Sequence, residues 1–195
     1  MSLDITVYTR QLSDDLIPKI QKRLNDFEMT CEIHPKFSFN DQTGFLPFKF
    51  QLTNPPFEKL RDKKLMSGFE LYIEDFDFEE EKKKVQPKPS FMDKVTGKKL
   101  PGKPLVDNEI DKRLRECKKV ISFVWHAADS FEVRFASLAS SILTELTNGV
   151  CSYPADNIWY DNEGFVEKTW SEIREYETTH LKEKDLVFHE FEKWD

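Results

Sequence analysis

Histidine is a common residue for proton transfer and metal binding, and the four in this chain are His34, His126, His180 and His189. None is spaced from another histidine or from a cysteine as metal ligands are. The run from His189 fails the H-E-x-x-H pattern because Lys193 stands at its last position. His126 ends an apolar run just before a helix start, where ligand sites occur. His126 is therefore a candidate ligand-pocket residue, with an ordinary hydrogen-bonded histidine as the alternative.

The other chemical motifs are missing. Cys31, Cys117 and Cys151 are far apart, odd in number and without a C-x-x-C pair, which indicates buried thiols in a reducing compartment. No G-x-G-x-x-G or G-x-S-x-G run occurs, and Gly97-Lys98-Lys99 lacks the earlier glycine and the Ser/Thr of a phosphate-binding loop. The sequence therefore predicts no catalytic residue, no metal ligand and no cofactor. It favours binding over catalysis without excluding an enzyme.

The best candidate binding segment is acidic and aromatic. Between Asp156 and Asp161 it carries Trp159 and Tyr160, and such aromatics among polar groups anchor protein interfaces. We expect these four residues to contact a partner. The alternative is that Trp159 packs down on the preceding helix beside Leu146, because tryptophan is usually mostly buried.

A strand and a helix must position these residues. Lys119 to His126 is apolar at both sets of alternate positions, which predicts a central strand covered on both faces. Asp129 and Glu132 have the spacing of a capping box, so we expect a helix to begin there. Its apolar stripe runs to Leu146, and Asn148-Gly149 is a typical left-handed stop.

The remaining chain reads as short strands and helices. Pro18 is expected in a first helical turn, and Pro47 indicates that its strand is an edge or starts late. A change of alternation predicts a bulge or strand end near Glu74-Asp75. The expected strands are 3–8, 29–39, 46–52, 69–74 and 150–153, and the expected helices are 16–27, 57–65, 107–117 and 165–177. The period of 181–195 fits either a strand or a helix.

Together these elements predict an α+β fold, a mostly antiparallel sheet with helices packed on it, in two split βαβ-like halves. Seventeen phenylalanines predict an aromatic core. We expect one domain over 1–195, with subdomains 1–78 and 105–195 as the alternative. Residues 79–104, rich in lysine and proline, would be a mobile linker or surface loop, anchored at Phe91 and Met92.

The charge balance bears on partners. The chain has 36 acidic and 29 basic residues, net −7. Residues 82–104 hold eight lysines against one acid, net +7, so the rest of the chain carries −14. An acidic body disfavours nucleic acid and anionic membrane, and suits either solubility or a basic protein partner. The chain shows no signal peptide and no apolar run of 18 residues, so we expect a cytoplasmic protein.

One resemblance adds to this. Residues 143–160 contain a helix ending L-T-E-L-T-N-G, then a short strand, a proline and I-W-Y. This pattern resembles small bacterial proteins, some of which are taken to be immunity proteins of polymorphic toxin systems. The resemblance implies bacterial origin and a non-enzymatic, toxin-binding role, and it supplies no catalytic residue.

The functional expectation is a cytosolic protein-binding domain with an acidic aromatic surface, in its narrower form an immunity protein that neutralises a basic toxin. The alternative is a small enzyme or ligand-binding domain with a pocket near His126.

Overall fold

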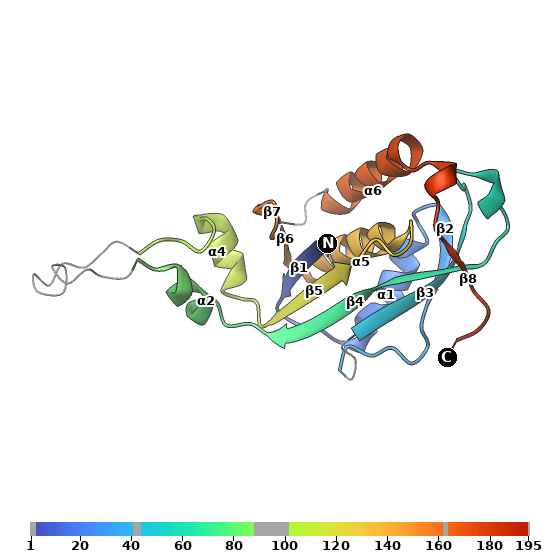
Figure 1. The fold of residues 1–195 in the computed structure, drawn as a ribbon. Helices are drawn as coiled ribbons and strands as arrows, with labels where there is room; N and C mark the ends of the chain where they lie inside the picture. Colours follow the sequence, from blue (N-terminus) through green and yellow to red (C-terminus); the bar gives the residue numbers. More distant parts are fainter. Residues whose placement is uncertain (1–2, 41–43, 88–101, 162–163, 195) are drawn as a thin grey trace, which may run out of the picture.

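The structure, a computed structural model, describes residues 3–40, 44–87, 102–161 and 164–194. In these residues seven strands form one sheet in the order β2-β3-β4-β5-β1-β6-β7, and β8 pairs with β4 beyond the end of β5. Every pairing is antiparallel. With helices packed on the sheet (Figure 1), this confirms the predicted α+β class.

Most element bounds follow the predicted segments, but the helix expected over 57–65 is only a short 3-10 turn, the strand expected over 29–39 ends at Ile33, and β7 was not expected. The strands are β1 (Leu3–Thr9), β2 (Met29–Ile33), β3 (Gly44–Leu52), β4 (Leu65–Asp75), β5 (Lys119–Trp125), β6 (Val150–Tyr153), β7 (Ile158–Tyr160) and β8 (His189–Glu190). The α-helices are α1 (Ile17–Leu24), α2 (Phe78–Val85), α4 (Asn108–Leu114), α5 (Glu132–Thr147) and α6 (Phe165–Glu175). Short 3-10 turns occur at Asp14–Leu16, Glu58–Leu60 and Glu183–Asp185, and a π-helical turn at Tyr176–His180 follows α6.

The strand order brings strands from the N-terminal and C-terminal parts of the chain into one sheet. β5 is the central strand, as predicted, and it lies between β4 and β1. Because β5 and β6 are both antiparallel to β1, they run parallel with β1 between them, so β5-α5-β6 is a split βαβ unit. In the other half, β1 and β2 also run parallel, but three strands separate them. Strands from 1–78 and from 105–195 therefore share one sheet, and β1 of the first part lies between β5 and β6 of the second.

The core lies between the sheet and α5, and it is aromatic. The Phe48 and Phe135 rings stack at 4.6 Å, and the Phe50 ring meets both Phe135 and Phe131 edge-on. All four residues are buried. In Figure 1, α5 lies on the sheet and α6 lies on the far side of α5. This arrangement explains why most of α5, including its serines, is buried.

The expectation that β5 is covered on both faces was wrong in part. Ile121 and Phe123 face α5 and are buried, but Val120 and Val124 on the other face are only half-buried. Helices α2 and α4 cover that second face only at one end, around Val120. Apolar alternation on both faces of β5 therefore reflects two different environments, a helix-covered core and a partly open sheet surface.

With Asp129 as its N-cap, helix α5 would begin at Ser130. It begins two residues later, at Glu132. Its N-cap is Phe131, whose backbone N–H donates to the Asp129 carboxylate. The Glu132 side chain reaches back past Asp129 and accepts from the backbone N–H groups of His126 and Ala128. The two acids thus organise the β5–α5 turn, but not as a capping box.

Helix α5 ends at the predicted Asn148-Gly149 pair, but the roles of the two residues differ from the prediction. Asn148, not Gly149, takes the left-handed conformation, with φ 49°. Gly149 is needed for a close approach, since a Cβ there would lie 2.4 Å from the Tyr8 carbonyl oxygen. The glycine lets β6 begin against β1 immediately after the helix.

Pro47 lies in an interior strand, which corrects the prediction of an edge. β3 pairs with β2 on one side and β4 on the other, and Pro47 stands opposite Gly68. The Pro47 carbonyl accepts from His34 N–H, so the proline nitrogen, which has no hydrogen to donate, also faces the β2 side. The last β2 pair is Ile33 with Phe48, so Pro47 lies one residue beyond the end of β2. Gly68 has no room for a side chain, because a Cβ would lie 2.3 Å from Leu46 O and 2.6 Å from Phe45 Cζ.

The segment 79–104 is not a loop throughout. Helix α2 covers Phe78–Val85, capped by the Asp77 carboxylate, which accepts from two backbone N–H groups. Three acids in the first turn and three lysines in the last turn complement the helix dipole, so this charge run forms a helix. Phe91 and Met92 lie outside the described residues. The strand end predicted at Asp75 is confirmed, since β4 ends there.

The C-terminal tail crosses the sheet. After β8, Phe191 N–H donates to Lys64 O, and the Lys49 ammonium lies 5.3 Å from the centroid of the Phe191 ring. The Trp194 ring meets the His34 ring edge-on at 5.0 Å. The tail therefore covers the β2–β3–β4 part of the sheet face that α5 leaves open.

Candidate functional site

A pocket of about 320 Å³ opens at one end of the sheet. β1 begins at this end, and β5 and β6 finish there, because β1 runs opposite to both. The facing walls come from α5 and α6. The lining residues are Asp4, Trp125, Val133, Ser137, Tyr153, Ala155, Asp156, Thr169, Glu172, Ile173 and Tyr176.

Helical spacing explains the two helix walls. Val133 and Ser137 are one turn apart on α5, so they lie on the same face. On α6 and the turn after it, Thr169, Glu172 and Tyr176 follow at three- and four-residue steps. The serine is small, which leaves space between the helices where a larger side chain would fill it.

The inner surface is apolar and aromatic. Trp125 is 8% exposed and Ile173 is 4% exposed. Burial raises the pKa of the Tyr153 phenol well above its ordinary value, while a hydrogen bond with Ser137 acts in the opposite direction. Tyr153 therefore stays neutral at ordinary pH, and its hydroxyl group is bonded with Ser137, another residue of the pocket wall.

The Thr169 hydroxyl is the polar feature of the pocket that needs explaining. Thr169 is 2% exposed. Among the residues that the structure describes, its Oγ1 is the buried side-chain polar atom that has no hydrogen-bond partner. Buried hydroxyls are normally paired, and a helical threonine usually bonds back to a carbonyl one turn earlier. The oxygen has almost no accessible surface, so this unpaired hydroxyl lies within the pocket wall and not at its open side.

Three carboxylates give the pocket a negative charge. Asp156 and Glu172 are exposed, and Asp4 is half-buried. Within the described chain, neither Asp4 nor Asp156 has an ion-pair partner, and Glu172 Oε1 lies 3.9 Å from Lys168 Nζ. An apolar cavity with acids of this kind attracts a cation that has an apolar body.

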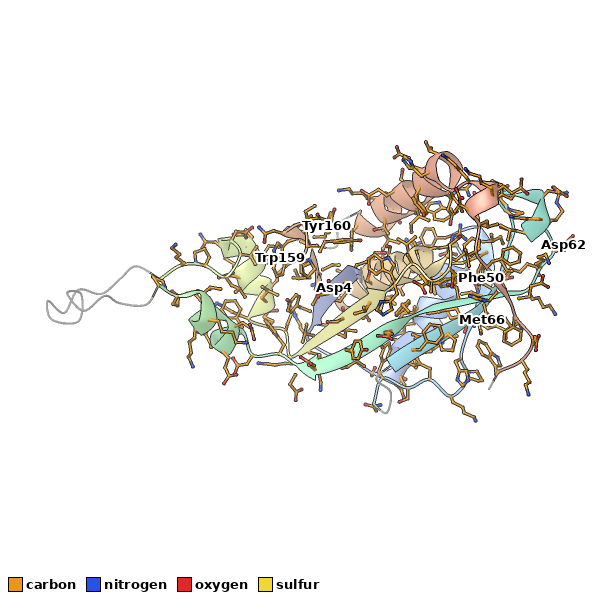
Figure 2. All side chains as sticks on the ribbon, viewed as in Figure 1. Asp4, Phe50, Asp62, Met66, Trp159 and Tyr160 are labelled. Carbon is orange, nitrogen blue, oxygen red and sulfur yellow. The ribbon has the colours of Figure 1, made fainter. Side chains whose placement is uncertain are left out.

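The predicted binding segment forms the neighbouring sheet edge. Trp159 and Tyr160 belong to β7, the short outermost strand, and Figure 2 shows both near Asp4 and far from Asp62. Of the acids at the two ends of this segment, Asp156 lines the pocket, and the backbone carbonyl of Asp161 accepts from Arg113.

The two aromatics of the segment point to opposite faces of the sheet, as successive strand residues must. Trp159 stacks on Tyr8 at 5.6 Å, on the face that α2 and α4 cover. Trp159 is half-buried there. It is therefore neither a fully exposed side chain nor packed beside Leu146, the two alternatives expected from the sequence. Tyr160 lies on the other face, stacked on Phe165 at 4.3 Å. The pair therefore does not form one aromatic patch.

His126 lies outside this pocket, although it follows the pocket residue Trp125. Its Nε2 atom is 3.6 Å from Glu70 Oε2, and its side chain is about half exposed. The Tyr72 hydroxyl donates to the same Glu70 oxygen at 2.6 Å. His126 thus belongs to a polar group on the open face of the sheet.

Sequence reasoning missed most of the pocket. Thr169 has the helical period of the inner face of α6, which indicates burial but not an unpaired hydroxyl. Asp4 alternates in β1 as an ordinary outward residue. Nothing local to either residue indicates that α5, α6 and the strand ends enclose a space.

Other chemistry finds little support in the described residues. No group of three or more His, Cys, Asp or Glu side chains there could hold a metal ion, and each helix there is too short or too polar to span a membrane. Burial raises the pKa of the Cys151 thiol, so this cysteine is not an activated nucleophile.

Comparisons with known protein families, with curated proteins and with solved structures found no match.

Proposed function

We propose that this protein is a non-enzymatic binding domain whose acidic surface, made by the pocket and by Asp156–Asp161, receives a basic protein partner. One observation carries the proposal. Three acidic residues line an apolar pocket, and two of them have no ion-pair partner within the described residues. Unpaired carboxylates at a partly apolar site gain from an incoming cation, since little internal pairing must first be broken.

The wider charge distribution supports the same surface. Residues 156–180 hold seven acids and two bases, net −5, and this part of the chain includes the β7 edge and the α6 wall. A negative region of this kind steers a basic partner during encounter. Binding should therefore weaken as salt rises, because exposed charges are screened.

A narrower form of the proposal is an immunity protein that neutralises a basic toxin. It rests on the resemblance of Leu143–Tyr160 to bacterial proteins of that type. The same residues form the end of α5, β6 and β7, which border the proposed surface. In this form, the partner expressed alone should arrest bacterial growth, and co-expression of this chain should restore it.

The test compares two triple variants in which acidic residues are replaced by neutral amides. One set lies at the proposed surface and the other at the far end of the molecule. The site variant is Asp156→Asn, Asp161→Asn and Glu172→Gln. The matched control is Glu58→Gln, Asp62→Asn and Glu183→Gln, which removes the same charge at the far end, where Figure 2 labels Asp62.

Each immobilised full-length chain is incubated at low salt with a lysate of the cells that carry its gene. A basic protein retained by the parent and the control, lost by the site variant and released by added salt, supports the proposal. Equal retention by both variants would overturn it.

A small-ligand binding domain or enzyme is the second candidate, and the pocket beside Trp125 is the observation that favours it. A ligand that raises the melting temperature of the parent protein by the same amount in His126→Ala would bind without His126. Loss of the shift in that variant would assign the ligand to the His126–Glu70 side of the sheet.

A further inference from the structure

We propose that Phe45, Glu70 and Tyr72, on the open face of the sheet, form a docking site for one arginine side chain of a partner protein. The inference goes beyond the proposed function, because the site lies on the sheet face opposite to α5. None of the three residues lines the pocket.

The site lies on a part of the sheet that the described helices and the C-terminal tail leave open. Helices α2 and α4 cover this face at one end, and the tail covers it at the other (Figure 1). Between them, Phe45 is 50% exposed and Tyr72 is 39% exposed. Aromatic side chains that stay exposed beside polar groups are typical of binding surfaces.

One cross-strand pair supplies both a ring and a charge. Phe45 in β3 stands directly opposite Glu70 in β4. Directly opposed residues of an antiparallel pair point to the same face, with their Cβ atoms about 5 Å apart. That face is the one away from α5, because Leu46 and Phe69, the sequence neighbours of the pair, are buried in the core. The Phe45 ring and the Glu70 carboxylate are therefore adjacent.

The Phe45 ring lies over Gly68, two residues before Glu70 in β4. A Cβ atom at Gly68 would lie 2.6 Å from Phe45 Cζ and 3.0 Å from Phe45 Cε2, so glycine leaves the room that the ring occupies. This contact covers the glycine backbone and uses one side of the ring. Because Phe45 is still half exposed, the other side of its ring is open to a partner.

Two neighbours hold the Glu70 carboxylate through one of its oxygens. The Tyr72 hydroxyl donates to Glu70 Oε2 at 2.6 Å, and His126 Nε2 lies 3.6 Å from the same oxygen. The bond from Tyr72 is the main cause of a lowered pKa of the Glu70 carboxyl, so this group is ionised at neutral pH. Within the described residues no donor reaches Glu70 Oε1, which leaves one carboxylate oxygen to accept from a partner.

A planar cation fits a ring beside a carboxylate. A guanidinium stacks on an aromatic ring through its flat face and donates hydrogen bonds in its own plane. On the outer side of the Phe45 ring, it also reaches Glu70 Oε1, because the two side chains are adjacent. An ammonium ion is a compact, strongly hydrated charge without a flat face, so lysine uses only part of the site.

The charge of this face selects a basic protein over a second copy of this chain. Glu70 and Glu74 both point to this face from β4, since they are four residues apart in one strand. Glu74 has no ion-pair partner within the described residues, and Glu70 pairs only with His126. Two copies packed face to face would bring these like charges together, whereas an arginine from a basic protein is attracted to them.

The test titrates the ¹⁵N-labelled full-length protein with small probes and follows its backbone amide signals by NMR. The probes are methylguanidinium and three capped Gly-X-Gly tripeptides, in which X is arginine, lysine or citrulline. Citrulline has nearly the shape of arginine but no charge. We expect the arginine peptide to bind at least about tenfold more tightly than the citrulline peptide and about threefold more tightly than the lysine peptide. The signals of Phe45, Glu70 and Tyr72 should shift most.

Three variants separate the ring from the charge. Glu70→Gln keeps an acceptor for the Tyr72 hydroxyl and removes the charge, so arginine binding should fall at least about tenfold. Phe45→Leu keeps apolar cover over Gly68 and removes the ring, so the preference for arginine over lysine should vanish. Glu74→Gln is the matched control, because it removes the same charge from the same face of β4 and should leave arginine affinity unchanged. Melting temperatures show whether each variant is folded.

Several outcomes would overturn the proposal. They are equal binding of the arginine and citrulline peptides, equal losses in Glu70→Gln and Glu74→Gln, or an unchanged preference for arginine in Phe45→Leu. Equal binding of the arginine peptide and methylguanidinium would assign the site to a free guanidinium compound instead of a protein. None of these outcomes bears on the proposed function, because its site variant changes none of these residues.

Discussion

Arg134 in α5 and Glu177 in the π-helical turn after α6 form a two-point ion pair in which each side chain is 1% exposed. Arg134 Nε donates to Glu177 Oε1 at 2.8 Å, and Nη2 donates to Oε2 at 3.2 Å. The guanidinium also lies over the Trp170 ring, 5.0 Å from its centroid. The pair fixes the end of α6 against α5, and with it Tyr176 in the pocket wall.

Replacing one partner of this pair should be costly. We expect Glu177→Gln to lower the free energy of unfolding by about 3 kcal/mol, because it leaves a buried guanidinium without its counter-charge. Urea unfolding measures the effect. Glu109→Gln breaks an exposed pair with Lys112 and should change stability little. Similar losses in the two variants would contradict the assigned role of the buried pair.

The cysteines should react slowly in the native protein. Burial raises the pKa of Cys31 to about 12 and that of Cys117 to about 11, so both remain protonated near neutral pH, where only the thiolate reacts. Labelling with a maleimide at pH 7 should be slow without denaturant and complete within minutes in urea. Fast native labelling of either residue, located by peptide mass analysis, would show that its environment opens readily.

Asp129 predicts a specific dependence of stability on pH. Burial raises the pKa of its carboxyl above the ordinary 3.8, while hydrogen bonds from Ser67 and from Phe131 N–H oppose the shift. A raised folded-state pKa means that the ionised form is disfavoured by folding. The resulting destabilisation is fully present above the folded pKa and is relieved as pH falls through it.

Asp129→Asn keeps an acceptor oxygen for both donors and removes the charge. The variant should therefore be more stable than the parent at pH 7, and the difference should shrink toward pH 4. Urea unfolding at the two pH values checks this. A difference that grows on acidification would mean that the carboxylate is stabilised by the fold instead.

Trp159 should matter for folding. We expect Trp159→Ala to cost about 2 kcal/mol, at the low end for removal of a large aromatic, because the side chain is half-buried against Tyr8. Trp159→Phe keeps an aromatic ring there and should recover most of the loss. Thermal unfolding measures both. No change in Trp159→Ala would indicate that the stacked pair contributes nothing to packing on the sheet face that α2 and α4 cover.

The β5–α5 unit could be predicted from the sequence because its signals are local. The apolar alternation of Lys119–Trp125 and the helical apolar stripe that ends at Leu146 are both visible in short stretches of sequence. Both elements form as expected. Pro47 shows the limit of such reasoning. Its missing hydrogen-bond donor is harmless because β2 ends one residue earlier, and no local pattern states where the neighbouring strand ends.

The pocket could not be predicted for a related reason. Asp4, Trp125, Tyr153 and Thr169 are far apart in sequence, and they meet only once the strand order places β1 between β5 and β6. Strand order depends on long-range packing, which a single sequence does not reveal. The opposite directions of Trp159 and Tyr160 follow from strand alternation, but only if Ile158–Tyr160 is known to be a strand and not a loop.

The place of β1 between β5 and β6 also bears on how the protein is made. Val7 pairs with Ile121 on one side and with Cys151 on the other, so β1 is synthesised long before either of its neighbours in the sheet. Until then it exposes apolar residues and unsatisfied edges on both sides, a state prone to aggregation. Rapid translation, or the shelter of a chaperone over the first strand, should therefore raise the yield of native protein.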